Sequence, residues 1–129
     1  YSNRDLAEEK GFTIDIEVDT FKVKGGPLLV ELFSNIISNA IEHSGGNKLK
    51  IKSIENDDTV TVRIEDNGRG IEDEYKEKIL EKGYIGPDSS GTGLGLYLCK
   101  KIVDTYKGKM EIKDSDMGGA CFDLTFKKI

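Results

Sequence analysis

The sequence is poor in the residues that mark several common classes of protein. Its 129 residues include two cysteines, two prolines, one histidine and no tryptophan. Cys99 and Cys121 lack the close spacing of metal ligands, and two isolated thiols in a well-charged domain indicate small hydrophobic residues in a cytoplasmic protein. Basic residues are also few: 19 Lys and Arg stand against 24 Asp and Glu, a net charge of −5. Nucleic acid is therefore not expected as the main partner, because no basic surplus would neutralise its phosphates.

Long apolar runs are absent as well. No stretch approaches the roughly 20 residues of a transmembrane helix, and no signal peptide is visible. We therefore expect a cytoplasmic domain without direct membrane contact, whose parent protein can still be anchored elsewhere. The length suits one domain with one core. The chain opens with Tyr1 rather than Met, so we interpret it as a piece of a longer protein.

What the sequence does contain is a series of strand and helix patterns. The expected elements are strands near 12–18, 21–23, 49–54, 60–66, 110–112 and 120–126, and helices near 27–43, near 72–82 and from 96 onward. We interpret residues 1–11 as the tail of a preceding segment and 12–129 as one domain. The order predicts an α+β sandwich, in which a mixed, mostly antiparallel sheet carries helices on one face.

The stretch I-E-D-N-G-R-G at 64–70 ends one of these strands. Val60, Val62 and Ile64 alternate with polar residues, so by the same parity Asp66 points to the buried side. A buried carboxylate is costly unless a donor reaches it. The glycines at 68 and 70 allow the backbone to lie close to whatever is above it. An ordinary turn that caps a strand would explain the same residues.

The helix predicted over 27–43 carries an unusual polar stripe. Glu31, Asn35, Asn39 and His43 recur every four residues and therefore lie along one line. Asparagine is a poor helix former, so two of them one turn apart beside an apolar face need a reason. One reason is that neutral amide oxygens suit a hard cation such as Mg²⁺; the other is a solvated helix edge.

The third stretch is the glycine loop G-T-G-L-G-L at 91–96, which leads directly into a helical pattern. Free backbone N–H groups and the helix dipole make such a loop a site for anions. The segment 83–93 before it is rich in Gly, Ser and Pro, and we expect it to be mobile. Amide oxygens for a metal, an inward carboxylate for an N–H donor and a loop for phosphate together describe a Mg-nucleotide site.

In this order and spacing, the three stretches resemble the catalytic ATP-binding domain of sensor histidine kinases, within the wider family of DNA gyrase, Hsp90 and MutL. N-A-I-E-H-S at 39–44 is similar to the N box, D-N-G-R-G at 66–70 to the G1 box and G-T-G-L-G-L to the G2 box. The resemblance covers about 12–127 and implies the Bergerat-type two-layer sandwich. It also implies transfer of the γ-phosphoryl group of Mg-ATP to a histidine on a separate dimerisation and phosphotransfer domain, with a response regulator downstream.

The resemblance implies a role for individual residues. Asn35 and Asn39 would hold Mg²⁺, and Asn35 and His43 would be the catalytic pair. Asp66 would accept the exocyclic amine of adenine. The other nucleotide-binding residues that it implies are Gly68, Gly70, Ile71, Lys82, Gly91, Thr92, Gly93, Leu94, Gly95 and Leu96, with the ATP lid at 83–95.

The sequence departs from the kinase pattern in three places. The F box reads I-L-E-K-G-Y, with Leu80 and Tyr84 where phenylalanines are usual. Glu42 stands where a basic residue is frequent. The lid at 83–95 has no Lys or Arg. The cation that meets the γ-phosphate is therefore open, with His43 and Lys82 as candidates, and His43 is equally well explained as a surface residue at a helix end.

Three other functions stay open on the sequence alone. A gyrase- or Hsp90-like ATPase would carry a glutamate base where Asn35 stands, and an asparagine cannot take up a proton. A serine-kinase anti-sigma module and a domain that senses ATP without transferring phosphate are the others. The acceptor histidine of a kinase is missing, because the one histidine of the chain lies in the N box. We therefore expect the fragment alone to be inactive in phosphotransfer.

Overall fold

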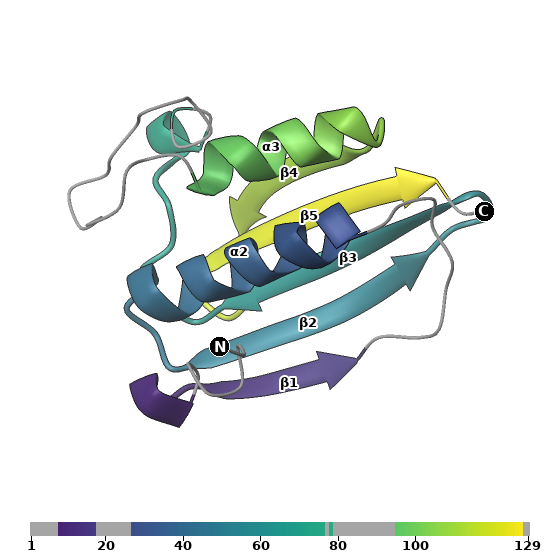
Figure 1. The fold of residues 1–129 in the computed structure, drawn as a ribbon. Helices are drawn as coiled ribbons and strands as arrows, with labels where there is room; N and C mark the ends of the chain where they lie inside the picture. Colours follow the sequence, from purple (N-terminus) through teal and green to yellow (C-terminus); the bar gives the residue numbers. More distant parts are fainter. Residues whose placement is uncertain (1–7, 18–26, 77, 79–94, 128–129) are drawn as a thin grey trace.

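The computed structural model describes residues 8–17, 27–76, 78 and 95–127 (Figure 1). The elements in this part are β1 (Thr13–Glu17), α2 (Pro27–His43), β2 (Lys48–Glu55), β3 (Thr59–Asp66), the short 3₁₀ helix η1 (Asp73–Tyr75), α3 (Gly95–Thr105), β4 (Lys109–Asp114) and β5 (Ala120–Lys127). No helix among these is long and apolar enough to cross a membrane.

The five strands form one sheet in the order β1-β2-β3-β5-β4. β1 runs parallel to β2, while the β2–β3, β3–β5 and β4–β5 pairs are antiparallel. Figure 1 shows α2 and α3 side by side on the same face of this sheet. The predicted sandwich, with a mixed and mostly antiparallel sheet and helices on one face, is therefore confirmed.

The core lies between that face and the two helices, as the alternation in the sequence requires. Val60, Val62 and Ile64 of β3 are buried beneath the helices. Leu32 of α2 and Cys99 of α3 are fully buried, and the Cys99 thiol lies 3.9 Å from the Leu32 carbonyl oxygen. Burial raises the pKa of the Cys99 thiol to about 12, so this cysteine packs as a small hydrophobic residue.

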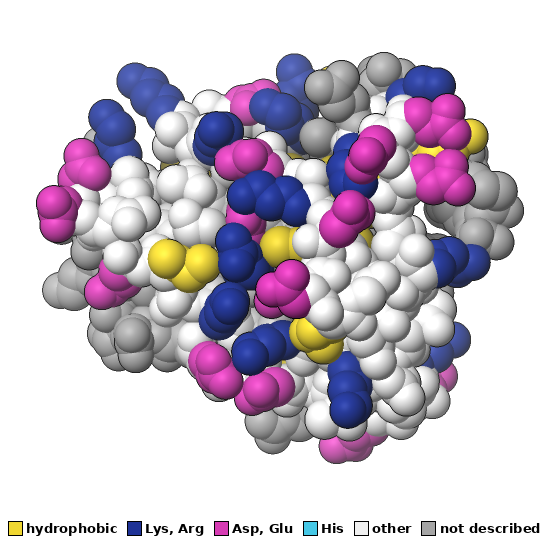
Figure 2. Space-filling view, turned by 180° about the vertical axis from the view of Figure 1, so that it is seen from behind, with side chains coloured by type: hydrophobic (Ala, Val, Ile, Leu, Met, Phe, Trp, Pro, Cys, Tyr) yellow, Lys and Arg dark blue, Asp and Glu magenta, His cyan; other side chains and the backbone are white. Residues whose placement is uncertain are grey.

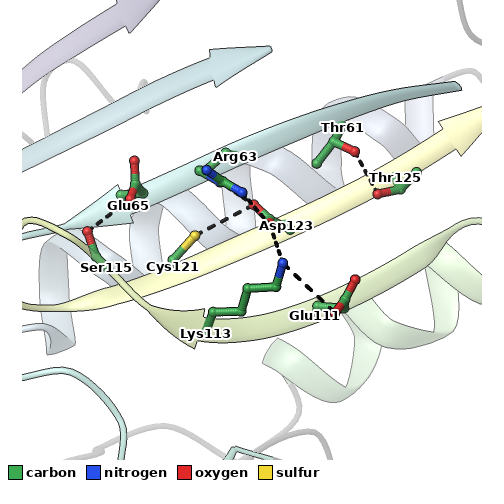
Figure 3. A network of polar contacts seen from close by, with 9 residues as sticks. All are labelled: Thr61, Arg63, Glu65, Glu111, Lys113, Ser115, Cys121, Asp123 and Thr125. Atoms are coloured by element: carbon green, nitrogen blue, oxygen red, sulfur yellow. Dashed lines mark hydrogen bonds and ion pairs between the residues drawn. The ribbon is translucent and has the colours of Figure 1, made fainter. Parts of the chain in front are cut away.

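The opposite face of the sheet, which we call the open face, carries charged and hydroxyl side chains instead (Figures 2 and 3). Its centre is Asp123 of β5, which accepts two hydrogen bonds from Arg63, at 2.8 and 3.0 Å. Asp123 also forms an ion pair with Lys113 at 3.1 Å. Burial raises the pKa of Asp123, but the hydrogen bonds from the two cations outweigh it and hold that pKa below its ordinary value. This network ties β3, β4 and β5 together on the face that none of the described helices covers.

The helix predicted near 72–82 is described only in part. Glu72 is extended, the three residues of η1 and Lys78 are in 3₁₀ conformation, and residues 77 and 79–82 lie outside the described part. Lys76 follows η1, and its ammonium group donates to the Ile71 carbonyl at 2.9 Å and pairs with Asp73 and with Asp114 of β4. These contacts hold the segment as a turn against the sheet. The strand expected at 21–23, the F box and most of the lid lie outside the described residues.

Candidate functional site

The three stretches singled out in the sequence meet at one end of the sandwich. The C-terminal end of α2, the end of β3 and the start of α3 all lie on the left side of Figure 1, together with the turn between β4 and β5. A hydrogen bond from the Arg69 N–H to the Ser44 carbonyl, 3.0 Å long, joins the segment after β3 to the end of α2. The fold thus collects in one place residues that are about 60 positions apart in the chain.

Asp66, the last residue of β3, is the buried carboxylate of this region, with 3% of its surface exposed. Its Oδ1 accepts hydrogen bonds from the Gly68 N–H at 2.9 Å and the Ala120 N–H at 3.2 Å. Burial raises the pKa of Asp66, and the two backbone donors offset this only in part. Oδ2 has no partner among the described residues, so one oxygen is fixed by the protein and the other can accept from a ligand. The predicted inward orientation of Asp66 is confirmed.

The two glycines after Asp66 have different structural reasons. A Cβ at Gly68 would lie 2.1 Å from the Ser44 carbonyl oxygen, so a side chain there would push the end of α2 away. Gly70 has φ +73°, a conformation that other residues adopt at a cost. Gly68 is therefore needed for packing within the protein, and its predicted role in admitting a base stays a prediction. Ile71, the next predicted site residue, packs against the core and is partly buried.

Asn67 lies between Asp66 and Gly68, and the resemblance implies no binding role for it. Its Oδ1 accepts the N–H groups of Asn47 and Lys48, both at 2.9 Å, and its Nδ2 donates to Asn47 Oδ1 at 2.8 Å. A Cβ at Gly46 would lie 2.4 Å from the same Oδ1. Asn67 therefore fixes the loop after α2 to the segment after β3. The tendency of asparagine side chains to bond backbone groups in turns was the available signal.

The predicted metal ligands lie on α2. Asn35 and Asn39 are both partly exposed, one turn apart on a continuous helix, and the buried Ile36 and Ala40 follow them. The polar stripe therefore borders the core as predicted. His43 is the last residue of α2, and its side chain lies outside what the structure describes.

The glycine loop is described only where it becomes α3. Gly95 begins the helix, and Leu96 is partly buried against the core. Because α3 begins there, the N–H groups of its first turn have no helical acceptor and favour an anion. The remaining predicted residues of this stretch, Gly91, Thr92, Gly93 and Leu94, lie outside the described residues, as does Lys82.

Comparison with known proteins agrees with this geometry. Residues 25–129 match the family model described as "Histidine kinase-, DNA gyrase B-, and HSP90-like ATPase". The chain is 32% identical over 126 residues to the heme sensor protein HssS of Staphylococcus saprophyticus, covering 95% of this chain and 27% of HssS. It is 32% identical over 132 residues to the sensor protein CitS of Halalkalibacterium halodurans, covering 95% of this chain and 24% of CitS. The chain thus spans about a quarter of the length of these relatives.

Solved structures give the same assignment. The catalytic domain of histidine kinase ThkA is similar with a TM-score of 0.82 at 27% identity, covering 98% of this chain and 91% of that one. The mycobacterial sensor histidine kinase MprB shares the fold, with a TM-score of 0.81 at 19% identity over 99% of this chain and 95% of that one. The chain belongs to the histidine kinase-, DNA gyrase B- and HSP90-like ATPase family, as an ATP-binding catalytic domain of the sensor histidine kinase type.

Proposed function

We propose that this domain binds Mg-ATP, with adenine on Asp66 and the phosphates at the start of α3, and presents the γ-phosphoryl group to a histidine of a separate domain. The observation that carries the proposal is the asymmetry of the Asp66 carboxylate. Oδ1 accepts two backbone N–H groups, while Oδ2 has no partner among the described residues. The exocyclic amine of adenine is a donor that Oδ2 can accept.

The residues that follow Asp66 in the chain suit a flat apolar base. Ile71 is a partly buried apolar side chain beside the core, and Gly70 has no side chain to occupy the space next to it. A Cβ at Gly70 would lie 3.5 Å from its nearest neighbours, the backbone atoms of Gly119. In this arrangement the protein orients the base by one charged acceptor and by shape.

The phosphate end fits a bound Mg²⁺ ion. Asn35 and Asn39 offer oxygens of the kind Mg²⁺ prefers, and an ion held partly by phosphates needs few protein ligands. When bound, Mg²⁺ neutralises charge that develops on the transferred group. The contribution of this chain is to hold the phosphates between α2 and the first turn of α3, and His43 or Lys82 is the candidate to meet the γ-phosphate.

Transfer to histidine is favoured over hydrolysis because Asn35 cannot act as a base toward water. The acceptor would be supplied by the dimerisation and phosphotransfer domain of the parent protein, and a response regulator would receive the phosphoryl group next. Both steps place the work of this domain in the cytoplasm, where ATP is available. A domain that senses ATP without transferring it is the second candidate, because the segment 83–95 has no Lys or Arg.

The test is phosphotransfer in trans. The domain is incubated with labelled Mg-ATP and the histidine-bearing helical domain of the parent protein. We expect an acid-labile label on the acceptor histidine, lost in Asn39→Ala and retained in Glu31→Ala, an exposed position two turns earlier on the same stripe. ATP binding without any label on the acceptor would favour the sensing function instead.

A further inference from the structure

The turn between β4 and β5, residues 115–119, is attached to both faces of the end of β3. Glu65 and Asp66 are neighbours in that strand and point to opposite faces. On the helix side, Ala120 donates its N–H to Asp66 Oδ1 at 3.2 Å. On the open face, Ser115 donates its hydroxyl to Glu65 Oε1 at 3.0 Å, as Figure 3 shows at the left. The carboxylate proposed to bind adenine is thus connected to a hydroxyl on the far side of the sheet.

Ser115 is also the centre of the turn itself. Its hydroxyl accepts the Met117 N–H at 3.0 Å, and its own N–H donates to the Gly119 carbonyl at 2.7 Å. Its carbonyl accepts the Gly118 N–H at 3.0 Å. Ser115 and Glu65 are both buried, and a hydrogen bond in the low-dielectric interior is stronger than the same bond in water. This bond therefore joins the turn to β3 through side chains, in addition to the backbone pairing of β3 with β5 that begins at Cys121.

The turn has no free space toward Asp66. A Cβ at Gly119 would lie 2.0 Å from Asp66 Oδ1, 2.5 Å from the Asp66 carbonyl oxygen and 2.6 Å from the Gly68 nitrogen. Backbone here is in direct contact with the carboxylate. A shift of the turn by a few tenths of an ångström would change both the Ala120 hydrogen bond and the direction of Oδ2.

We propose that Ser115 is a positioning residue for base recognition. Through Glu65 it holds the turn, the turn holds the Ala120 N–H against Asp66, and this sets the direction of the oxygen that meets the base. The inference rests on the proposed function of Asp66 and adds a residue outside the three sequence boxes, on the opposite face of the sheet.

The first test compares ATP with purine riboside triphosphate, which lacks the exocyclic amine. Wild-type protein should prefer ATP by about 10- to 100-fold, the range for a hydrogen bond to a charged acceptor. In Ser115→Ala that preference should fall at least about threefold, while affinity for the analogue stays within about twofold, because only the contact with the amine is lost. Ser115→Thr, which keeps the hydroxyl, should restore the preference.

Thr61→Ala is the matched control. Thr61 and Thr125 form a hydroxyl–hydroxyl bond of 2.8 Å on the same face and the same two strands, away from the turn (Figure 3). Loss of this hydroxyl–hydroxyl bond should leave the preference for ATP over the analogue unchanged. Glu65→Gln, which retains an oxygen acceptor but no charge, should give an intermediate preference and serves if Ser115→Ala does not fold.

A second measurement needs no nucleotide. Amide exchange at Ala120 should accelerate about tenfold or more in Ser115→Ala relative to Leu124 in the same strand, and should not in Thr61→Ala, because local opening follows loss of local bonds. An equal loss of affinity for both nucleotides, or an unchanged Ala120 exchange rate, would overturn the positioning role. A wild-type protein that binds ATP and the analogue equally would instead overturn the proposed function of Asp66, and the two failures are thereby distinguished.

Discussion

Asp66→Asn separates recognition of the base from stability of the fold. Asparagine is nearly the same shape as aspartate and keeps an oxygen that can accept the Gly68 and Ala120 N–H groups, which now bond to Oδ1 at 2.9 and 3.2 Å. The second position changes from an acceptor to an amide donor. The amide donor of the new side chain would then face the exocyclic amine of adenine, which is also a donor.

The two effects have opposite signs. Loss of a charged acceptor is worth about 1.5–3 kcal/mol, so affinity for ADP should fall about 10- to 100-fold. Stability should be unchanged or higher. Burial raises the pKa of Asp66, which means that the ionised form destabilises the folded state at neutral pH. A neutral amide removes that cost.

Asp66→Ala would not make this distinction. It removes the acceptor of two backbone donors at once, and each unsatisfied buried donor costs about 1–3 kcal/mol, against a total stability of about 5–15 kcal/mol for a domain. Weak binding by that variant could reflect a damaged fold. Asp116→Asn, an exposed aspartate in the turn between β4 and β5, is the matched control for the change of side chain.

The assay pairs calorimetric titration with ADP and urea unfolding followed by circular dichroism. For wild type, affinity should also decline as pH falls through the raised pKa of Asp66, because the protonated carboxyl no longer offers a charged acceptor. Asp66→Asn should show no such decline. Unchanged ADP affinity in folded Asp66→Asn would refute base recognition by this residue, and a loss of several kcal/mol in stability would refute the account of its burial.

Three further results are expected. Gly119→Ala should destabilise the domain by about 1–3 kcal/mol through overpacking and weaken ADP binding. At Gly118 a Cβ would meet open space but φ is +100°, so Gly118→Ala should lower stability and leave ADP binding unchanged. Thermal shift measures stability and calorimetry measures binding, and equal ADP affinities of the two variants would contradict this. Arg63→Met should cost about 1.5–3 kcal/mol at pH 7 without changing ADP affinity. That difference should shrink as pH falls through the lowered pKa of Asp123, since an acid with a depressed pKa stabilises the fold only while ionised; a difference independent of pH in urea titrations would contradict the ion pair. Incubated alone with labelled ATP, the chain should gain no acid-labile label, and label on His43 would show that it carries its own acceptor.

Sequence pattern was sufficient for the sheet and the two long helices because their periodicities are strong. The alternation that ends at Asp66 predicted a buried carboxylate, and burial together with two backbone donors confirms it. The four-residue spacing of Asn35 and Asn39 predicted a polar stripe at the edge of a buried helix, and both residues are partly exposed on α2. Local spacing determines such features, so one sequence can reveal them.

Features that depend on contacts between distant segments could not be predicted in this way. Gly119 lies against Asp66, and Ser115 bonds to Glu65. The two residues of each pair are at least 50 positions apart in the chain. Lys76 likewise pairs with Asp114 of β4. The partners of Gly119 and Ser115 depend on the register of β3 and β5, and the partner of Lys76 depends on the position of β4, neither of which the sequence alone gives.

The most direct test of the account is calorimetric titration of this chain with ATP, first with excess Mg²⁺ and then with excess chelator. Because Asn35 and Asn39 are proposed to meet the phosphates through the metal, ATP should bind in both conditions through its base and more tightly with Mg²⁺. Asn35→Ala with Asn39→Ala should remove the difference between the conditions and leave the affinity in chelator unchanged. Equal affinity of the wild-type chain with Mg²⁺ and with chelator, or no ATP binding at all, would contradict the account.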